Sequence, residues 1–498
     1  MPTATTHRAR AIRSSSRATE PRCPRSAPTN SICNGRTLGS RRPSGRPARS
    51  ARPPIRISIF PSDYFPSQRL SRISWVIEAK HGGSIVGYVR GLRCRECGAE
   101  YPPTQRTVCE ACFGPLEVAY EIEAVREAFR REALATRSAD LWRYRELLPV
   151  FDESSKVDLR PGFTPLRRAG NLAEALGLRD VWVKDDTVNP TNSFKDRPVA
   201  VAIAKAREWN LAAVGCASTG NLAAATAAAA AKAHLPCYVF APASLEPGKL
   251  LLPRIYGATV VPIDGTYDDA NRVALLAADR RGWGFVNINL RPYYAEGSKT
   301  LLFETWEQLG FDLPDVIVAP LGSGLLLTSL EKGIRELREL GELPEDATRL
   351  VGTQASGCAP IVRGFEAPDG RPRPVKRPET IAESLAIGDP GSGSEAIQAM
   401  RKTRGFADDP SDAEILEGQR LLAQTEGVFA EPAGGTTVAT LRRAREDGRI
   451  DRDERVVLLI TGNGLKAPGV WRETFPPLTP VPPTPAAVDA FLGGTGHG

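Results

Sequence analysis

Short apolar runs alternate along the chain with longer segments whose apolar residues recur at helical spacing. A continuous apolar run bounded by turn residues is typical of a buried strand, and a 3.6-residue period is typical of an amphipathic helix. The runs that predict strands are Val181–Lys184, Ala213–Cys216, Cys237–Ala241, Val260–Ile263, Phe285–Ile288, Val316–Ala319, Leu350–Gln354 and Val456–Thr461. Because helical segments separate most of these strands, we predict mostly parallel sheets covered by helices, an α/β fold.

Other regions lie outside this alternation. Residues 1–80 are rich in Arg, Ser and Pro and predict a disordered basic leader, and residues 476–498 predict a Pro-rich, disordered or extended tail. Residues 90–118 form a compact cysteine-rich segment, which a charged helical linker, Glu121–Leu148, joins to the strands that follow. The expected order is therefore leader, cysteine-rich segment, an α/β core within 119–475, and tail.

The basic charge is concentrated in the leader. Residues 1–75 hold fifteen arginines, no lysine and only Glu20 and Asp63 as acids, so they carry +13 while the whole chain carries +7. The remaining chain is net acidic, which argues against nucleic-acid binding by the protein as a whole. Three interpretations of the leader stay open: a transit peptide, a segment that binds an acidic partner, or translated upstream sequence, which we favour.

Composition and hydropathy predict a soluble, cytoplasmic protein. The chain is 41% hydrophobic and 25% charged, as in ordinary globular proteins. No apolar run approaches the roughly 20 residues that span a bilayer, and the leader lacks the apolar stretch of a secretory signal. The sequence does not fix the oligomeric state, for which a homodimer is our working expectation.

Four of the nine cysteines have the spacing of a metal site. Cys94 and Cys97 form one C-x2-C pair, and eleven residues separate it from a second pair, Cys109 and Cys112. Two such pairs present four thiolates in the tetrahedral arrangement that Zn²⁺ prefers, although the intervening loop is shorter than the usual length of about 15–20 residues. We predict a structural, zinc-ribbon-like site, with disulfides as the alternative.

One lysine follows a predicted strand at the position where ligands bind in open α/β sheets. Lys195 stands in the turn Asn-Pro-Thr-Asn-Ser-Phe-Lys-Asp-Arg, residues 189–197, between the strand Val181–Lys184 and an alanine-rich helix. Ligands bind beyond the carboxyl ends of such strands, and a lysine can form a Schiff base with a carbonyl cofactor. For this residue alone, a solvated lysine on a first helical turn is the simpler interpretation.

A second strand-to-helix turn carries Ser218, Thr219 and Asn221, which follow the strand that ends at Cys216. Such residues are ordinary helix caps. Their hydroxyls and the adjacent amides can also hold a carboxylate, and an asparagine can hydrogen-bond a ring hydroxyl.

Two further turns complete the pattern. Gly322, Ser323 and Gly324 lie between a strand and a helix, where glycines let backbone N–H groups approach a phosphate. Thr461 ends a buried strand and precedes two glycines, an arrangement that suits a ring packed against the strand end. Taken singly, each segment is also explained as an ordinary turn.

Together and in this order, the four turns resemble the fold type II enzymes of pyridoxal phosphate (PLP), and within them the threonine synthase family. The resemblance extends over roughly residues 90–470 and includes Ala295-Glu-Gly-Ser-Lys-Thr300, Ile387-Gly-Asp-Pro390 and Phe429-Ala-Glu-Pro432. It implies an open parallel-sheet core of two subdomains that binds PLP and acts as a lyase on a small molecule, O-phospho-L-homoserine.

The resemblance also implies residue roles. Ser218 and Thr219 would hold the α-carboxylate of the substrate, and Lys195 would hold PLP as a Schiff base. The other residues implied to bind PLP are Asn221 at the 3′ oxygen, Thr461 at the pyridine nitrogen, and, at the phosphate, the main-chain amides of Gly322, Ser323, Gly324, Leu325 and Leu326.

The implied reaction is γ-elimination of phosphate followed by addition of water at Cβ, which gives L-threonine. PLP would delocalise the carbanion, and the freed Lys195 would act as general base. Lys195 must be uncharged for this role, so we expect its pKa to be depressed. A neutral Thr461 should leave no full proton on the ring nitrogen, which favours elimination over transamination.

Two positions depart from the family pattern. Tyr294 stands where an arginine often helps to bind the substrate phosphate, with Arg291 and Lys299 nearby, and Leu222 stands where a hydroxyl residue often follows the Ser-Thr-Gly-Asn turn. Both changes remove contacts to the substrate phosphate and leave the cofactor chemistry intact.

Three alternatives stay open at this level. The first is another fold type II PLP enzyme, such as a threonine dehydratase or a cysteate-synthase-like enzyme. The second is a zinc-ribbon binding module with an inactive α/β body. The third is nucleic-acid binding by the leader, whose arginines are not interleaved with aromatic residues.

Overall fold

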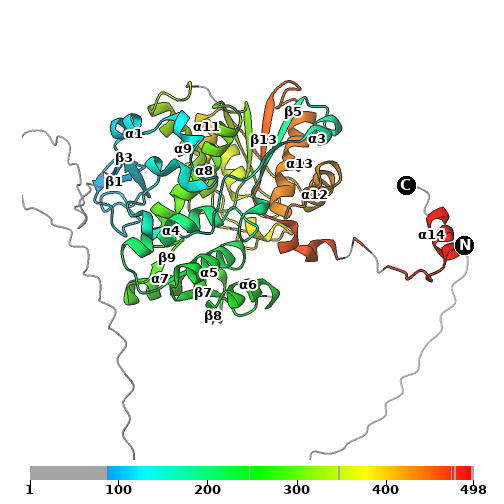
Figure 1. The fold of residues 1–498 in the computed structure, drawn as a ribbon, viewed down its shortest axis with the longest axis horizontal. Helices are drawn as coiled ribbons and strands as arrows, with labels where there is room; N and C mark the ends of the chain where they lie inside the picture. Colours follow the sequence, from blue (N-terminus) through cyan, green and yellow to red (C-terminus); the bar gives the residue numbers. More distant parts are fainter. Residues whose placement is uncertain (1–86, 246, 346–347, 473, 476–477, 495–498) are drawn as a thin grey trace, which may run out of the picture. The chain divides into compact units, whose positions relative to one another are not determined.

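The computed structural model describes residues 87–245, 247–345, 348–472, 474–475 and 478–494 (Figure 1). The leader predicted over residues 1–80 therefore lies outside the described residues. Seven of the eight predicted strands are confirmed to within one residue at each end.

The larger sheet has six strands in the order β12-β11-β10-β13-β5-β4. Neighbouring strands are parallel, except that β4 runs antiparallel to β5 at the edge. Its central strands are almost wholly buried, as expected for a parallel sheet covered on both faces. The strands are β12 (Ala407–Asp408), β11 (Arg349–Thr353), β10 (Val316–Pro320), β13 (Arg455–Ile460), β5 (Asp180–Asp185) and β4 (Leu166–Arg168).

The smaller sheet has four parallel strands in the order β8-β7-β6-β9. They are β8 (Thr259–Ile263), β7 (Cys237–Pro242), β6 (Val214–Ala217) and β9 (Gly284–Phe285). The prediction of a strand over Phe285–Ile288 is wrong beyond Phe285. The chain turns there because the Asn289 side chain accepts a hydrogen bond from the backbone N–H of Phe285 at 2.7 Å.

Helix α8 (Arg291–Gln308) forms the centre of the helical packing. It contacts both α4 (Asp196–Glu208) and α9 (Leu325–Glu339), and nearly its whole length is buried. Such a helix belongs to the core rather than to the surface. The alanine-rich helix α5 (Asn221–Ala233) packs closely on β6 and β7 because its buried face carries mostly methyl groups.

The other helices are short or cover the sheets from outside. They are η2 (Glu153–Ser155), α3 (Gly170–Ala175), η3 (Asp186–Val188), η4 (Pro247–Leu250), α6 (Leu251–Ile255), α7 (Tyr267–Arg281), α10 (Pro360–Glu366), η5 (Glu383–Leu385), α11 (Gly393–Lys402), α12 (Asp412–Glu426), α13 (Pro432–Glu446), η6 (Gly464–Lys466) and η7 (Pro468–Trp471).

The cysteine-rich segment forms a three-stranded antiparallel sheet in the order β2-β1-β3, made by β1 (Val89–Cys94), β2 (Glu100–Tyr101) and β3 (Leu116–Tyr120). We call residues 89–120 the ribbon.

The linker predicted as helical over Glu121–Leu148 is not continuous. It is broken into α1 (Ile122–Ala128), α2 (Arg131–Leu134) and the 3-10 helix η1 (Leu141–Leu147). The first break falls at Phe129, whose extended backbone (φ −75°, ψ 125°) accompanies burial of its ring 6.3 Å from that of Trp306.

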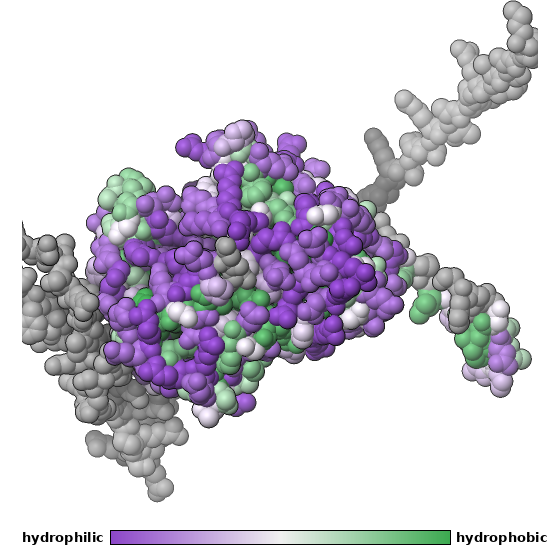
Figure 2. Space-filling model, turned by 90° about the horizontal axis from the view of Figure 1, so that it is seen from above, coloured by the Kyte–Doolittle hydropathy of each residue, from purple (hydrophilic) through white to green (hydrophobic). Residues whose placement is uncertain are grey.

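The tail differs from its prediction as a disordered or extended segment, because residues Pro485–Gly494 form helix α14. A proline fits the first position of a helix, and the alanines that follow favour its continuation. Hydrophilic residues dominate the face shown in Figure 2, with smaller hydrophobic patches between them. No helix in the described ranges is long and apolar enough to cross a bilayer.

Candidate active site

Hydrogen bonds join the turn that carries Lys195 to the end of β13. The turn lies between η3, which follows β5, and helix α4. The Phe194 N–H donates to the carbonyl of Thr461 at 2.9 Å, and the Ser193 hydroxyl donates to the same oxygen at 3.2 Å. Because β13 and β5 are parallel neighbours, Lys195 and Thr461 both lie beyond the carboxyl ends of the strands of the larger sheet.

Lys195 has the depressed pKa that its predicted role requires. Its Nζ lies 4.6 Å from the ring centroid of Phe194 and 5.9 Å from that of Tyr294. No hydrogen bond or ion pair to another described residue engages this nitrogen. Burial lowers the pKa of Lys195 to about 8, against the opposing effect of the Glu431 carboxylate. The uncharged amine is therefore far more populated at neutral pH than in an ordinary lysine.

A network of buried ion pairs anchors the turn that carries Lys195 to the protein core. Arg197 donates to Asp186 at 2.7 and 2.8 Å and to Glu304 at 2.7 Å, and the Nζ of Lys184 lies 2.7 Å from Glu304. All four side chains are fully or almost fully buried, and buried charges persist in proteins when they are paired. We call Lys184, Asp186, Arg197 and Glu304 the lysine-turn network.

The second predicted turn lies between β6 and α5. The hydroxyl of Ser218 accepts hydrogen bonds from the N–H groups of Gly220 (3.3 Å) and Ala223 (3.2 Å), so it satisfies one of the free amides in the first turn of α5, whose N-cap is Gly220. The hydroxyl proton of Ser218 is left to donate. Thr219 is half-buried next to it, and Leu222 packs against the apolar core of the smaller sheet.

Sequence reasoning missed the residue that orients Asn221. The Nδ2 of Asn221 donates to the two carboxylate oxygens of Glu431 at 3.1 and 2.9 Å. Burial raises the pKa of Glu431, while the bond from Asn221 and the charges of Lys466 and Lys195 lower it. Gly462 provides the space, because a Cβ there would collide with the carboxylate of Glu431. Glu431 belongs to the segment Phe429-Ala-Glu-Pro432, which contributes to the family resemblance, but the resemblance assigned no role to this glutamate.

The glycine turn, residues 322–324, lies between β10 and the N-terminus of α9. Gly324 has a φ of +88°, and a Cβ there would lie 2.5 Å from the carbonyl of Ser392, so this position requires glycine. The Ser392 N–H donates to the carbonyl of Ser323 at 2.9 Å, which fixes the turn. No acceptor among the described residues engages the N–H groups of Gly322, Ser323 or Gly324. These amides, with the first N–H groups of α9, can therefore bind an anion.

Thr461 is the last of the residues expected to bind the cofactor. It follows β13 and is buried, and its hydroxyl has no hydrogen-bond partner within the part of the chain that the structure describes. The four turns follow the carboxyl ends of parallel strands β5, β6, β10 and β13, where α/β folds bind ligands. A lysine of low pKa, an oriented amide, an anion cradle and a neutral hydroxyl complement the aldehyde, 3′ oxygen, phosphate and ring nitrogen of PLP.

The four ribbon cysteines also come together. Their sulfur atoms all lie within 4.8 Å of one another, and the pairs Cys94–Cys112 and Cys97–Cys109 are each separated by 3.5 Å. These thiols are free, and their separations exceed a disulfide bond of about 2.05 Å. Zn–S bonds of about 2.3 Å in a tetrahedron place sulfurs about 3.8 Å apart, so the cluster fits zinc.

Comparisons with known proteins agree with this architecture. Residues 157–462 match the family described as pyridoxal-phosphate dependent enzyme. The threonine synthase of Methanocaldococcus jannaschii is 39% identical over 378 residues, which cover 76% of this chain and 93% of that protein. The threonine synthase of Mycobacterium tuberculosis strain H37Rv is 41% identical over 352 residues, which cover 70% and 94%. Among solved structures, the T.th. threonine deaminase has a TM-score of 0.52 and 25% identity over 64% of this chain and 94% of that one.

Proposed function

The chain belongs to the pyridoxal-phosphate dependent enzymes and, within them, to the threonine synthase family, and we propose that it converts O-phospho-L-homoserine and water into L-threonine and phosphate. It is a PLP-dependent lyase that acts on a small molecule. The observation that carries the proposal is the Lys195 amine, whose pKa of about 8 and lack of a described hydrogen-bond partner leave it able to react beside the end of β13.

Four groups are proposed to hold the cofactor. Lys195 Nζ binds the aldehyde carbon, Thr461 faces the pyridine nitrogen, and the amides of residues 322–326 bind the phosphate. Asn221 gives one Nδ2 hydrogen to Glu431 and has a second one for the 3′ oxygen. PLP, when bound, supplies an electron sink that stabilises negative charge at Cα of the amino-acid substrate.

Lys195 is proposed to move the protons of the reaction. Its Nζ takes protons from Cα and Cβ of the substrate, and phosphate leaves from Cγ. Protons return to Cγ and to Cα, and water adds its hydroxyl at Cβ. A pKa of about 8 suits a group that must both accept and return protons near neutral pH.

The substrate carboxylate is proposed to bind at the start of α5, through the hydroxyls of Ser218 and Thr219. Ser218 is fixed by the two amides that donate to its hydroxyl, so its remaining proton has a defined direction. The neutral Thr461 hydroxyl stabilises the ring nitrogen without giving it a full proton, and this favours elimination over transamination.

The ribbon is proposed to bind one structural Zn²⁺ through Cys94, Cys97, Cys109 and Cys112. The cluster uses four protein thiols and offers no open position for a substrate, so its role is to stabilise a segment too small to have its own apolar core. Metal analysis of the purified protein should give one zinc per chain, and Cys97→Ala should lose it. Cytoplasmic location and a homodimer stay predictions.

Phosphate release from phosphohomoserine by the PLP-loaded enzyme tests the proposed function. We expect release of phosphate together with formation of L-threonine, and no turnover in Lys195→Ala. Lys232→Ala, which removes an exposed lysine of α5, is the matched control and should keep full activity. Turnover of threonine, serine or phosphoserine in place of phosphohomoserine would identify a dehydratase or a cysteate-synthase-like enzyme and contradict the proposal.

A further inference from the structure

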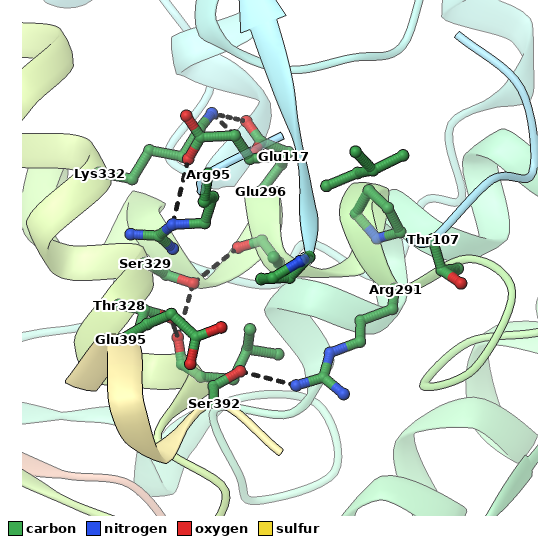
Figure 3. Close-up of a pocket in the computed structure, with 15 residues that line it drawn as sticks. Arg95, Thr107, Glu117, Arg291, Glu296, Thr328, Ser329, Lys332, Ser392 and Glu395 are labelled. Atoms are coloured by element: carbon green, nitrogen blue, oxygen red, sulfur yellow. Dashed lines mark hydrogen bonds and ion pairs between the residues drawn. The ribbon is translucent and has the colours of Figure 1, made fainter. Parts of the chain in front are cut away.

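Arg291 is a partly buried cation that has no carboxylate at ion-pair distance among the described residues. Its guanidinium donates to the hydroxyl of Ser392 at 2.6 Å (Figure 3). Burial lowers the pKa of Arg291, while the more distant Glu395, Tyr294 and Tyr267 oppose this effect. A guanidinium that has lost water without gaining a counter-ion is a natural receptor for an anion.

The surroundings of Arg291 connect it to the active site. Tyr294, one turn further along α8, has its ring centroid 5.9 Å from Lys195 Nζ. Ser392, which accepts the bond from Arg291, donates its N–H to Ser323 of the glycine turn at 2.9 Å. Arg291 is therefore linked through Ser392 to the glycine turn, and Tyr294 of the same helix lies near the Lys195 amine.

Tyr267 connects Arg291 to the second turn as well. Burial raises the pKa of Tyr267 to about 12, and the charge of Arg291 acts in the opposite direction, so the two groups are within electrostatic reach. The Tyr267 hydroxyl donates to the carbonyl of Ala217 at 3.4 Å, directly before Ser218. A small anionic ligand held at Arg291 would thus lie near the proposed site of the substrate carboxylate.

The other cations that line the cavity beside Arg291 already form ion pairs with carboxylates. Arg291 lines a cavity of about 40 Å³ between the ribbon, α8 and α9. The other cations on its wall are paired, Arg95 with Glu331 at 3.1 Å and Lys332 with Glu296 at 2.8 Å.

Two lysines outside this cavity are also ion-paired. Lys299, on α8, is fully buried between Glu296 (2.5 Å) and Glu336 (2.7 Å), so an anion could reach it only by breaking both pairs. Lys249 is ion-paired with Glu383. Among these described cations, Arg291 is the one that can receive an anion without breaking an ion pair.

We propose that Arg291 and Ser392 bind the phosphate monoester of the substrate, an inference that rests on the proposed function. A guanidinium offers two parallel N–H donors to a phosphate, and the Ser392 hydroxyl, which accepts from Arg291, has its own proton to donate. The cofactor phosphate has the same chemistry, but the free amides of residues 322–324 already provide for it.

Kinetics of the PLP-loaded enzyme with Arg291→Met and Arg291→Lys test this assignment. The KM for phosphohomoserine should rise about 30-fold or more in Arg291→Met and by less in Arg291→Lys, which keeps the charge but loses the planar fork. Binding of L-threonine, which has no phosphate, should stay unchanged when followed by the cofactor absorbance. Lys249→Met, which removes a cation already paired with Glu383, is the control and should leave the KM unchanged.

Three outcomes would overturn the assignment in distinguishable ways. A KM for phosphohomoserine that is the same in Arg291→Met and wild type refutes it and leaves the proposed function intact. An equal loss of affinity for PLP and for phosphohomoserine assigns Arg291 to the cofactor phosphate instead. A wild-type enzyme that releases no phosphate contradicts the proposed function itself, whatever the variants do.

Discussion

Two buried ion networks among the described residues have similar composition and different connections. The lysine-turn network joins β5, η3, α4 and α8 within the core. A second network of two lysines and two glutamates joins α8 to α9, and we call it the helix network. Its members are Glu296, Lys299, Lys332 and Glu336.

The helix network, unlike the lysine-turn network, has a described contact to the ribbon. Tyr120 of β3 donates to Glu296 at 2.7 Å, and Arg95, inside the first C-x2-C pair, pairs with Glu331 of α9 at 3.1 Å. Helix α9 begins directly after the glycine turn. The comparison teaches that contacts within the core hold the Lys195 turn, whereas the helix that follows the glycine turn is also held by contacts to the ribbon.

The largest effect is expected from Glu304→Gln, which breaks the lysine-turn network. It leaves Arg197 and Lys184 buried without a full counter-charge, so the free energy of unfolding should fall by about 3–5 kcal/mol in chemical denaturation. Asp312→Asn removes an exposed partner of Arg455 and should cost less than about 1 kcal/mol. Equal losses in the two variants would show that the network does not hold the turn.

Gly324→Ala should break the phosphate cradle without touching either network. The positive φ and the nearby Ser392 carbonyl strain any Cβ, so PLP affinity should fall about tenfold or more in a fluorescence titration. Gly322→Ala is the matched comparison, because the nearest atom to its Cβ would be a side-chain methyl of Ile387 at 3.2 Å. A larger loss at Gly322 than at Gly324 would contradict the account.

Arg95→Met removes one of the ion pairs that join the ribbon to α9; Glu117 of β3 also pairs with Arg335 of α9, at 2.9 Å. Losing a partly buried ion pair of about 1 kcal/mol should weaken PLP binding about fivefold and leave the site of attachment at Lys195 unchanged. Arg93→Met is the control, because the ion pair of Arg93 is with Glu117 of the ribbon itself. Chelation of the proposed zinc should weaken PLP binding in wild type and by a smaller factor in Arg95→Met; unchanged PLP affinity after chelation would refute the connection.

The smallest effect is expected from Glu431→Gln, which tests what sets the pKa of Lys195. The Glu431 carboxylate raises this pKa, so its removal should move the midpoint of PLP capture by apoenzyme below the value of about 8 expected for wild type. The rate of capture would be measured between about pH 6 and 10. In Arg95→Met the midpoint should stay at its wild-type value. An upward shift in Glu431→Gln would contradict this electrostatic explanation.

The sequence was informative where structure is local. Strands β5, β10 and β13 and the turns that follow them could be predicted because an apolar run and its bounding glycines or polar residues are contiguous. The prediction failed where distant contacts decide the structure. The linker breaks at Phe129 because its ring packs near Trp306, and the strand predicted over Phe285–Ile288 ends early because Asn289 turns the chain.

The electrostatic part of the site could not be predicted for the same reason. Asn221 and Glu431 are hydrogen-bonded although 210 positions separate them. Lys299 lies near the position where the family often has a phosphate-binding arginine, but α9 brings Glu336 within 2.7 Å of it and pairs its charge. Such pairings depend on how helices pack, which periodicity does not encode.

The central claim is that the uncharged amine of Lys195 attaches the cofactor. Borohydride reduction of the PLP-loaded protein, followed by peptide mass analysis, tests it most directly. We predict a single pyridoxyl adduct on Lys195, formed in wild type and in Arg95→Met. An adduct on another lysine, or none at all, would contradict the claim.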